Sequence, residues 1–311
     1  MFAWPLPLRA AESWPARPIR MLVAFPPGGG ADVSARIVMQ RLSETLGQPV
    51  VIENRVGANG GIGAESVVHA QADGYTLLFG SSANITINPH LMHLAYDPMK
   101  DLVPVSMVAF SPLLVFVNPG VVPVNTIHEL VQYVQARPGT VNFASAGNGS
   151  QGHLAAELLN LMAGIHMVHI PYKGGPPAVN GTLAGEVGVS FASAPSVLSY
   201  THSGRLRGLA TTGQHRSAFA PDLPTVAESG YPDYDVVIWS GVFAPFGTAA
   251  EIITRLHGEI TRAVQQPDIR AALIKSGAEP MVLSAAELDG YLRTDFARWR
   301  KVVQAAKIVM P

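Results

Sequence analysis

Two hydrophobic patterns alternate along the chain. Short apolar runs rich in β-branched residues are typical of buried strands, and longer stretches with an apolar residue every three or four positions are typical of helices. The predicted strands cover residues 19–25, 48–54, 75–79, 103–109, 113–117, 141–144, 167–170, 187–191, 206–211 and 236–244. The predicted helices cover residues 33–46, 64–72, 127–136, 154–163, 176–184, 249–265, 267–276 and 285–307. This order predicts an α/β fold with a parallel sheet and right-handed crossovers.

Two of the predicted strand-to-helix connections are built from small residues. Residues 25–32 read Phe-Pro-Pro-Gly-Gly-Gly-Ala-Asp, where the prolines end the strand and the glycines allow a sharp turn. Residues 145–153 read Ser-Ala-Gly-Asn-Gly-Ser-Gln-Gly-His and lead into the helix at 154–163. Unpaired amides at a helix N-terminus carry the positive end of its dipole and attract anions. Both loops are therefore predicted to bind a carboxylate through free amides, and Asp32 is predicted to cap the helix at 33–46.

Other candidate residues lie at the ends of predicted strands. The small polar run at residues 80–84 follows strand 75–79, and in a parallel sheet it would lie beside the first loop, where ligands bind. Lys173 lies in a loop rich in glycine and proline, so that a functional lysine and a solvated surface lysine both fit. His153 lies one turn inside the second helix, where it either reaches a ligand or is an exposed side chain. Trp239 is interpreted as a core residue.

The composition excludes several classes of function. Charged residues make up 14% of the chain, against ~25% in an average protein, and the net charge is −1. This argues against a nucleic-acid or membrane-surface binder, which would show a basic patch. An anionic ligand remains compatible, because backbone amides bind anions without formal charge. The chain has no cysteine, which excludes disulfides, thiolate catalysis and cysteine-type zinc sites.

The length of 311 residues suits about two domains. The first is predicted to comprise residues 17–104 and 225–311, and the second residues 105–224, with the polar, proline-rich stretch 216–224 as the return connection. Residues 1–16 are predicted to be a disordered N-terminal remnant. The apolar run at 2–8 is short, and no basic residue precedes it, so it is not a complete secretory signal. Residues 10–12 (Ala-Ala-Glu) are compatible with a cleavage site.

The sequence motifs give little support to an enzymatic function. Residues 147–152 satisfy G-x-G-x-x-G between a strand and a helix, but the acidic residue expected about 20 positions later is missing from 166–173. If the helix begins at Ser150, the third glycine also loses its packing role. His166 and His169 are predicted to face opposite sides of a strand, so they cannot both bind one metal ion and no metal site is expected. No cofactor is expected either. A dinucleotide-binding enzyme stays as a remote alternative.

Several motifs occur together in an order that resembles one family. They are Phe25-Pro26-Pro27-Gly28-Gly29 with Asp32, Glu53-Asn54-Arg55, Asp73-Gly74-Tyr75-Thr76-Leu77-Leu78, Ser145-Ala146-Gly147-Asn148-Gly149-Ser150 with His153, Pro171-Tyr172-Lys173-Gly174, Gly204-Arg205-Leu206-Arg207-Gly208-Leu209-Ala210 and Leu223-Pro224-Thr225-Val226-Ala227-Glu228. Over roughly residues 17–290 the chain resembles the Bug proteins, which are extracytoplasmic solute receptors of tripartite tricarboxylate transporters.

The resemblance implies a type II periplasmic-binding-protein fold, in which two α/β domains joined by crossover strands close on a ligand like a Venus flytrap. It also implies a small organic carboxylate as ligand, membrane transporter subunits as partners and a periplasmic location. A monomer without enzymatic activity is expected. The ligand-binding residues that it implies are Phe25, Pro27, Gly28, Gly29, Ala31, Asp32, Ser81, Asn84, Ser145, Gly147, Gly149, Ser150, His153, Tyr172, Lys173, Gly174, Ser193 and Ala194.

One departure from the family pattern concerns the strand near 187–192. Members that resemble amino-acid binders place an aspartate there, whereas this chain has Gly188 and Ala192. A buried ammonium group without a partner costs about 1 to 3 kcal/mol or more. The sequence therefore predicts a mono- or dicarboxylate, aromatic acids included, rather than an amino acid. A sensory receptor for a two-component system would use the same loops and remains an alternative.

Overall fold

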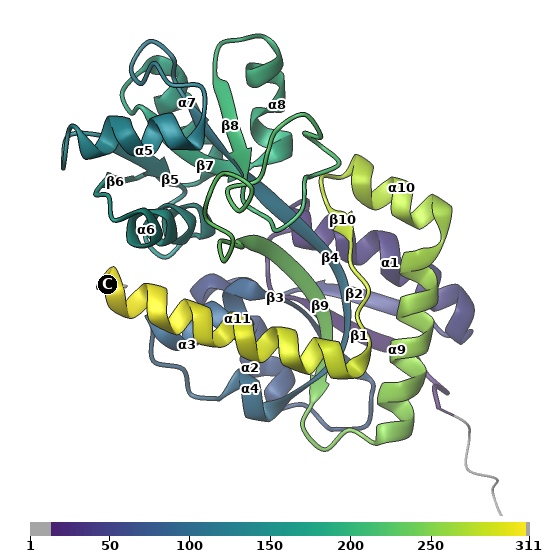
Figure 1. Cartoon of the computed structure of the whole chain (residues 1–311). Helices are drawn as coiled ribbons and strands as arrows, with labels where there is room; N and C mark the ends of the chain where they lie inside the picture. The colour runs from purple at the N-terminus through teal and green to yellow at the C-terminus, as the bar shows by residue number, and fades with distance from the viewer. Residues whose placement is uncertain (1–13, 309–311) are drawn as a thin grey trace, which may run out of the picture.

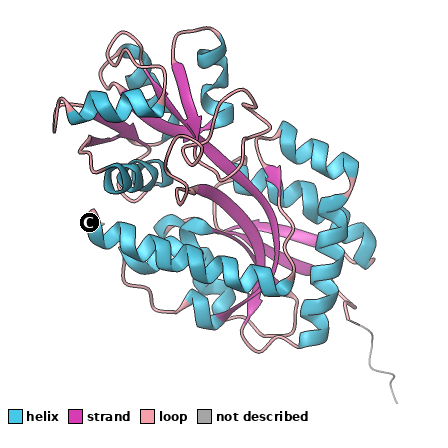
Figure 2. Ribbon diagram, in the orientation of Figure 1, coloured by secondary structure: helices cyan, strands magenta, loops and turns pink. Residues whose placement is uncertain are grey.

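The predicted alternation of strands and helices builds two α/β lobes (Figures 1 and 2). A computed structural model describes residues 14–308 of the chain. The first lobe contains β1 (Ile19–Val23), α1 (Gly30–Leu46), β2 (Val50–Asn54), η1 (Ala58–Gly60), α2 (Gly61–Val68), β3 (Thr76–Ser81), η2 (Ala83–Ile87), α3 (Asn88–Leu91), α4 (Pro98–Asp101), β9 (Val237–Pro245), α9 (Ala250–Gln265), α10 (Pro267–Lys275), β10 (Glu279–Pro280) and α11 (Ala285–Ala305). The second contains α5 (Ile127–Gln135), β5 (Asn142–Ser145), α6 (Gln151–Ala163), β6 (Val168–Pro171), α7 (Gly175–Ala184), β7 (Val189–Ser193), α8 (Ala194–His202) and β8 (Arg207–Thr211). Strand β4 (Leu102–Val117) belongs to both lobes.

The sheet is mixed, with a parallel set of three strands in each lobe. In the first lobe β1 pairs in parallel with β2 and β3, and in the second β5 pairs in parallel with β6 and β7. Strands β4 and β9 run antiparallel to their neighbours and to each other. The expected parallel sheet is therefore correct for the strands joined by helical crossovers, whereas the connecting strands are antiparallel.

Strand β4 passes directly from one lobe to the other. The predicted strands 103–109 and 113–117 are one continuous element, because Ser111 and Pro112 stay paired with Ile238 and Val237 of β9. From Leu113 onward β4 pairs with β7, and from Leu114 also with β8. The passage between lobes thus lies at residues 112–113 rather than at the predicted 104–105.

The chain also returns from the second lobe to the first at a later position than the predicted boundary at 224–225. Val226, Tyr234 and Val236 are buried in the apolar cluster that includes α5, α6 and β5 of the second lobe. The amide N–H of Val236 donates to the carbonyl oxygen of Thr212, which leaves β9 as the strand that re-enters the first lobe.

Apolar packing joins the lobes on one side. The long helix α11, which is opened by a capping box of Ser284 and Glu287, runs beneath α6 (Figure 1). Its C-terminal half places Trp299 and Val302 in the same buried cluster as Ile87 of η2 and the apolar face of α6. The first half of α11 packs instead against the core of the first lobe.

Two local features differ from the sequence predictions. Residues 14–16, predicted as part of the disordered remnant, are packed: the Trp14 ring lies 6.1 Å from that of Tyr75, centroid to centroid, and the Ala16 amide donates to the Tyr75 hydroxyl at 2.9 Å. The remaining predicted remnant, with residues 10–12, lies outside the described residues. The polar run after β3 begins the π-helical turn η2, which the periodicity did not indicate.

Candidate functional site

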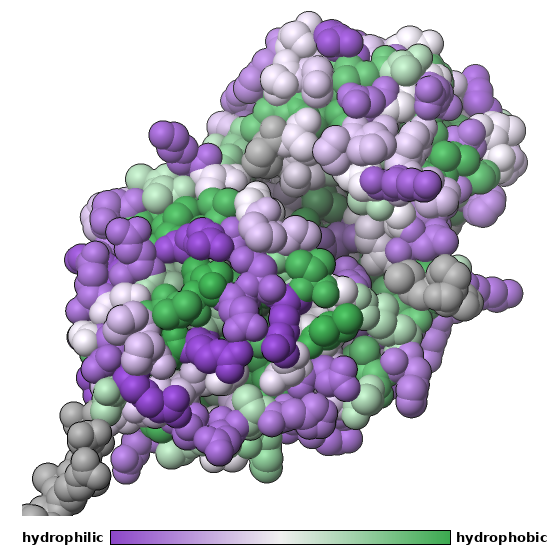
Figure 3. All heavy atoms as spheres, turned by 180° about the vertical axis from the view of Figure 1, so that it is seen from behind, coloured by the Kyte–Doolittle hydropathy of each residue, from purple (hydrophilic) through white to green (hydrophobic). Residues whose placement is uncertain are grey.

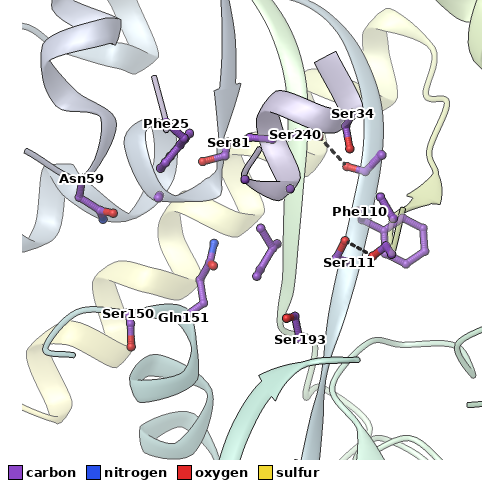
Figure 4. Close-up of a pocket in the computed structure, with 18 of the residues that line it drawn as sticks. Phe25, Ser34, Asn59, Ser81, Phe110, Ser111, Ser150, Gln151, Ser193 and Ser240 are labelled. Carbon is purple, nitrogen blue, oxygen red and sulfur yellow. Dashed lines mark hydrogen bonds between the residues drawn. The ribbon is translucent and has the colours of Figure 1, made fainter. Parts of the chain in front are cut away.

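A cleft of about 520 Å³ lies between the two lobes. Its walls are the N-terminal end of α1 and the residues after β3 in the first lobe, and the N-terminal ends of α6 and α8 in the second (Figure 4). Seen from behind, the surface is hollowed where the lobes meet (Figure 3). These elements meet here because each wall follows the carboxyl end of a strand.

In the first Gly-rich loop, one backbone amide is already hydrogen-bonded to a side chain of the same loop. Gly28 has φ of 78°, and its amide donates to Asp32 Oδ2 at 2.9 Å. The same carboxylate accepts from Arg36 Nε at 2.9 Å and from Asn54 Nδ2 at 2.9 Å. The hydrogen bond from Arg36 is the main reason that the pKa of Asp32 is lowered to about 2. Asp32 therefore stays ionised and paired within the loop.

Asp32 is not the N-cap that the sequence predicted. The N-cap of α1 is Gly29, which has no side chain to accept a bond, and Asp32 is the third helical residue. From there its carboxylate reaches back to the Gly28 amide and compensates the positive end of the helix dipole. The Gly28 amide, expected to be free, is thus already bonded.

The second Gly-rich loop is arranged in a similar way. Ser150 is the N-cap of α6, and its Oγ accepts from the His153 amide at 3.4 Å. Gly149 has φ of 69°, and its amide donates to His153 Nδ1 at 3.1 Å. His153 is 7% exposed and does not line the cleft, so the side chain predicted to reach a ligand instead supports the loop from inside.

Gly152 has a packing role, which was expected to be lost only if the helix began at Ser150; α6 begins at Gln151. A Cβ atom at this position would lie 2.5 Å from the carbonyl oxygen of Phe191 on β7. Only glycine allows α6 to approach the strand this closely. The third glycine of G-x-G-x-x-G is therefore explained by helix–strand packing.

Three amides at the N-terminal ends of α1 and α6 stay free for a ligand at the cleft. Within residues 14–308, the N–H groups of Gly30, Ala31 and Gln151 have no hydrogen-bond acceptor, and all three residues line the cleft. The hydroxyl of Ser81 adds a further donor, because it is buried and its Oγ has no partner in that part of the chain. Uncommitted donors thus face the cleft from both lobes.

The two crossing strands form the floor of the cleft. Ala109, Phe110 and Ser111 of β4 lie opposite Ser240, Trp239 and Ile238 of β9 in the sheet register. The floor combines apolar surface from Phe110 and Ile238 with serine hydroxyls. Among the described residues, those that line the cleft include no Asp, Glu, Lys, Arg or His, so the site can bind an anion only through neutral dipoles.

Comparison with known protein families shows which family the chain belongs to. A model described as the tripartite tricarboxylate transporter family receptor matches residues 34–308. The chain belongs to this receptor family. It is a solute-binding receptor and not an enzyme, and receptors of this family are periplasmic.

Individual relatives agree with the family match. The receptor is 42% identical over 297 residues to BugT of Bordetella pertussis, across 95% of this chain and 91% of BugT. R. palustris Rpa4515 with adipate is 34% identical, with a TM-score of 0.79, covering 96% of this chain and 100% of that one. MatC from Rhodopseudomonas palustris with bound malate is 31% identical, with a TM-score of 0.75, covering 93% and 100%. The predicted periplasmic-binding-protein fold and the resemblance to the Bug proteins are confirmed.

Some of the predicted ligand-binding residues lie together in the walls of the cleft. These residues come from both Gly-rich loops, from the end of β3 and from the start of α8, which are far apart in sequence. The predicted residues that line the cleft are Phe25, Gly29, Ala31, Ser81, Gly149, Ser150 and Ser193. Their contacts with a ligand stay a prediction.

Apart from Ala194, whose side chain lies outside the described part of the structure, the other predicted residues do not line the cleft. Asn84 is buried and accepts from the Ser81 amide at 2.8 Å, which orients the residue that does line it. The Tyr172 hydroxyl donates to Glu186, away from the site. The remaining predicted residues are bonded within their loops, exposed outside the wall or, for the last, at the start of α8: Pro27, Gly28, Asp32, Ser145, Gly147, His153, Lys173, Gly174 and Ala194.

Sequence reasoning missed several residues of the cleft wall. Ser34 follows Gly30 by four positions and shares its helix face, so the period of the helix could have indicated it. Asn59 belongs to the Gly-rich turn at 57–63, which is recognisable in the sequence. The floor residues could not have been found, because their place depends on β4 and β9 pairing beneath the loops. The C-terminal end of α10 reaches the cleft for a similar reason.

Gln151 connects the two lobes across the cleft (Figure 4). Its Nε2 donates to Ser82 Oγ of the first lobe at 2.7 Å. Such a bond contributes about 0.5 to 1.5 kcal/mol, so we expect Gln151→Ala to shift the population toward open forms roughly two- to tenfold. Spin labels on cysteines introduced at exposed Thr45 and Asn180 report this as a longer interlobe distance, without background because the chain has no cysteine. Gln135→Ala, on the surface of α5, should leave the distance unchanged.

Proposed function

We propose that this receptor captures a small organic mono- or dicarboxylate in the cleft and delivers it, in the periplasm, to the membrane subunits of a tripartite tricarboxylate transporter. The observation that carries the proposal is the pair of helix N-termini, α1 and α6, that offer free amides to one neutral cleft from opposite lobes. Adipate and malate in the two solved relatives support this ligand class.

Binding energy would come from dipoles rather than from cationic side chains. Each helix N-terminus contributes about 0.3 to 2 kcal/mol to a bound anion. The buried Ser81 hydroxyl, which has no partner in the described residues, would gain one from a carboxylate oxygen. Phe110 and Ile238 on the floor would contact the carbon skeleton.

The same geometry disfavours an amino acid. No carboxylate among the described residues lines the cleft, and Asp32 is already paired with Arg36, so a ligand ammonium group would find no counter-charge. Leaving that group without a partner costs about 1 to 3 kcal/mol or more.

Closure follows from the placement of the donors. A ligand that contacts Ala31 in one lobe and Gln151 in the other binds the closed form better than an open form, which is what shifts the population toward closure.

A thermal-shift panel tests the ligand class. We expect adipate, malate or succinate to stabilise the receptor, by about 2.7 kcal/mol when the ligand is present at 100 times its dissociation constant. Aspartate and the neutral succinamide should give much smaller shifts, because the first adds an ammonium group and the second lacks the charge. Aspartate matching succinate, or no shift with any acid of the panel, would contradict the proposal.

A further inference from the structure

Two histidines are stacked beneath the N-terminal end of α6. The rings of His153 on α6 and His169 on β6 lie 3.7 Å apart, centroid to centroid, with an angle of 11° between their planes. The Phe143 ring of β5 packs beside the pair, 4.9 Å from His169 and 6.1 Å from His153, centroid to centroid. Neither histidine lines the cleft, so the pair has no direct contact with the ligand site.

Both rings hydrogen-bond to the loop 145–150. His153 Nδ1 accepts from the Gly149 amide at 3.1 Å, so Nδ1 carries no proton and the neutral ring is protonated at Nε2. His169 Nε2 lies 2.6 Å from Ser145 Oγ, which in turn accepts from the Gly147 amide at 3.1 Å. The conformation of the loop thus depends on two imidazoles.

We propose that His153 and His169 are positioning residues, which hold the 145–150 loop and the start of α6 in the form that accepts a ligand, provided both rings are neutral. This inference rests on the proposed function of the cleft. Gly149 and Ser150 line the cleft, and Gln151 follows directly with its free amide. A displacement of Gly149 therefore changes the geometry of that wall.

Protonation would break this arrangement. A second proton on His153 must go to Nδ1, the atom that accepts from Gly149, and two stacked imidazolium ions repel each other. The groups that face the pair offer limited compensation: Glu157 Oε1 lies 3.8 Å from His153 Nε2, and the pKa of Glu157 is itself raised by burial. His166 interacts with Glu157 rather than with the pair.

Burial supports the neutral state of both rings. It lowers the pKa of His153 to about 4, with a smaller contribution from neighbouring His169, and it lowers the pKa of His169 to about 4. A histidine whose pKa is lowered in the folded state binds fewer protons than in the unfolded state. The free energy of unfolding is therefore unaffected above the ordinary value of 6.5 and declines as the pH falls from 6.5 toward 4. In the folded receptor the rings take up protons, and the loop loses its order, only around pH 4 and below.

The test separates the bond to Gly149 from the ring stack. His153→Phe keeps an aromatic ring but removes the acceptor, whereas His153→Asn places an amide oxygen close to the position of Nδ1. In calorimetric titrations with adipate we expect the Phe variant to lose about tenfold or more in affinity and the Asn variant to stay within about threefold of the wild type. The Asn variant should also lose less affinity than the wild type when the pH is lowered through 4, where the folded wild-type rings gain protons. His128→Asn on α5 is the matched control.

NMR of the wild-type receptor tests the positioning role of the histidines in the absence of a ligand. With ¹⁵N-labelled histidine, we expect His153 to show an unprotonated Nδ1 and to titrate well below 6.5. A proton on Nδ1 at neutral pH, or unaltered affinity of the Phe variant, would overturn the positioning role. If the wild type binds no carboxylate, the proposed function fails, while the tautomer and the Gly149 amide resonance in the two variants still decide whether the histidines hold the loop.

Discussion

A valine in place of Gly149 is expected to abolish ligand binding while the receptor stays folded. Gly149 lines the cleft with φ of 69°, a conformation that a β-branched residue adopts only under strain. Relief of that strain rotates the backbone, withdraws the amide from His153 and moves the start of α6, where Ser150 and Gln151 contribute to the wall. Loss of two hydrogen bonds to a charged ligand, at about 1.5 to 3 kcal/mol each, lowers the affinity about a hundredfold or more.

Gly164 offers a matched control at the other end of the same helix. It is the C-cap of α6 with φ of 61°, and a Cβ atom there would meet no other atom within 4 Å. Gly164→Val should therefore impose similar backbone strain, seen as a similar fall in melting temperature, without changing the calorimetric affinity for adipate. Equal affinities of the Gly149 and Gly164 variants would show that the loop geometry does not determine binding.

Replacing Asp295 with leucine is expected to lower the free energy of unfolding by about 3 to 5 kcal/mol. Asp295 on α11 is 4% exposed, and its Oδ2 accepts from Thr86 Oγ1 at 2.6 Å and from Trp239 Nε1 at 2.9 Å. Leucine would leave the Trp239 indole N–H buried without a partner, whereas Thr86 Oγ1 would keep only the Ser82 carbonyl oxygen, 3.1 Å away, as acceptor. Thr86 lies in η2 and Trp239 lies between two floor residues of β9, so the walls of the cleft would loosen as well.

The conservative variant distinguishes a lost acceptor from a lost charge. In Asp295→Asn the amide oxygen can occupy the position of Oδ2 and keep both bonds, and the main loss is the charge 3.8 Å from Arg298. Because burial raises the pKa of Asp295, part of the cost of ionisation is also removed. We expect urea unfolding to show a loss below about 2 kcal/mol for this variant. A leucine variant as stable as the asparagine variant would contradict the anchoring role of Asp295.

Local sequence patterns predicted most helices and strands well, because hydrophobic periodicity and backbone preferences act within short stretches of the chain. The burial of Trp239, the ends of α9 and α10 and the two Gly-rich turns follow from periodicity, proline and glycine. The continuous β4 could not be read in this way, because Ser111-Pro112 resembles a break and becomes part of a strand only when paired with β9. The π-helical turn η2 likewise has a long-range contact that no local pattern encodes, because its Thr86 hydroxyl donates to Asp295, more than two hundred positions away.

At the cleft, the sequence predicted the two loops that form part of the walls but not which of their amides are already hydrogen-bonded. Composition indicated free amides at both glycine runs, yet the Gly28 amide is bonded to Asp32 and the Gly149 amide to His153. The amides that stay free belong to the next residues along each helix, among them Ala31 and Gln151. Which donor is already used depends on side-chain positions that no local pattern encodes.

By itself, the sequence determined the α/β alternation, the two helix N-termini that carry the glycine loops, the absence of thiol chemistry and the family. These properties depend on residue types and spacings within short stretches, where backbone preference and hydrophobic period are decisive. Only the tertiary structure decided that β4 and β9 form the floor of the cleft, that Gln151 reaches Ser82, and that His153 turns inward onto His169. Each of these is a contact between distant segments, set by how whole elements pack and pair.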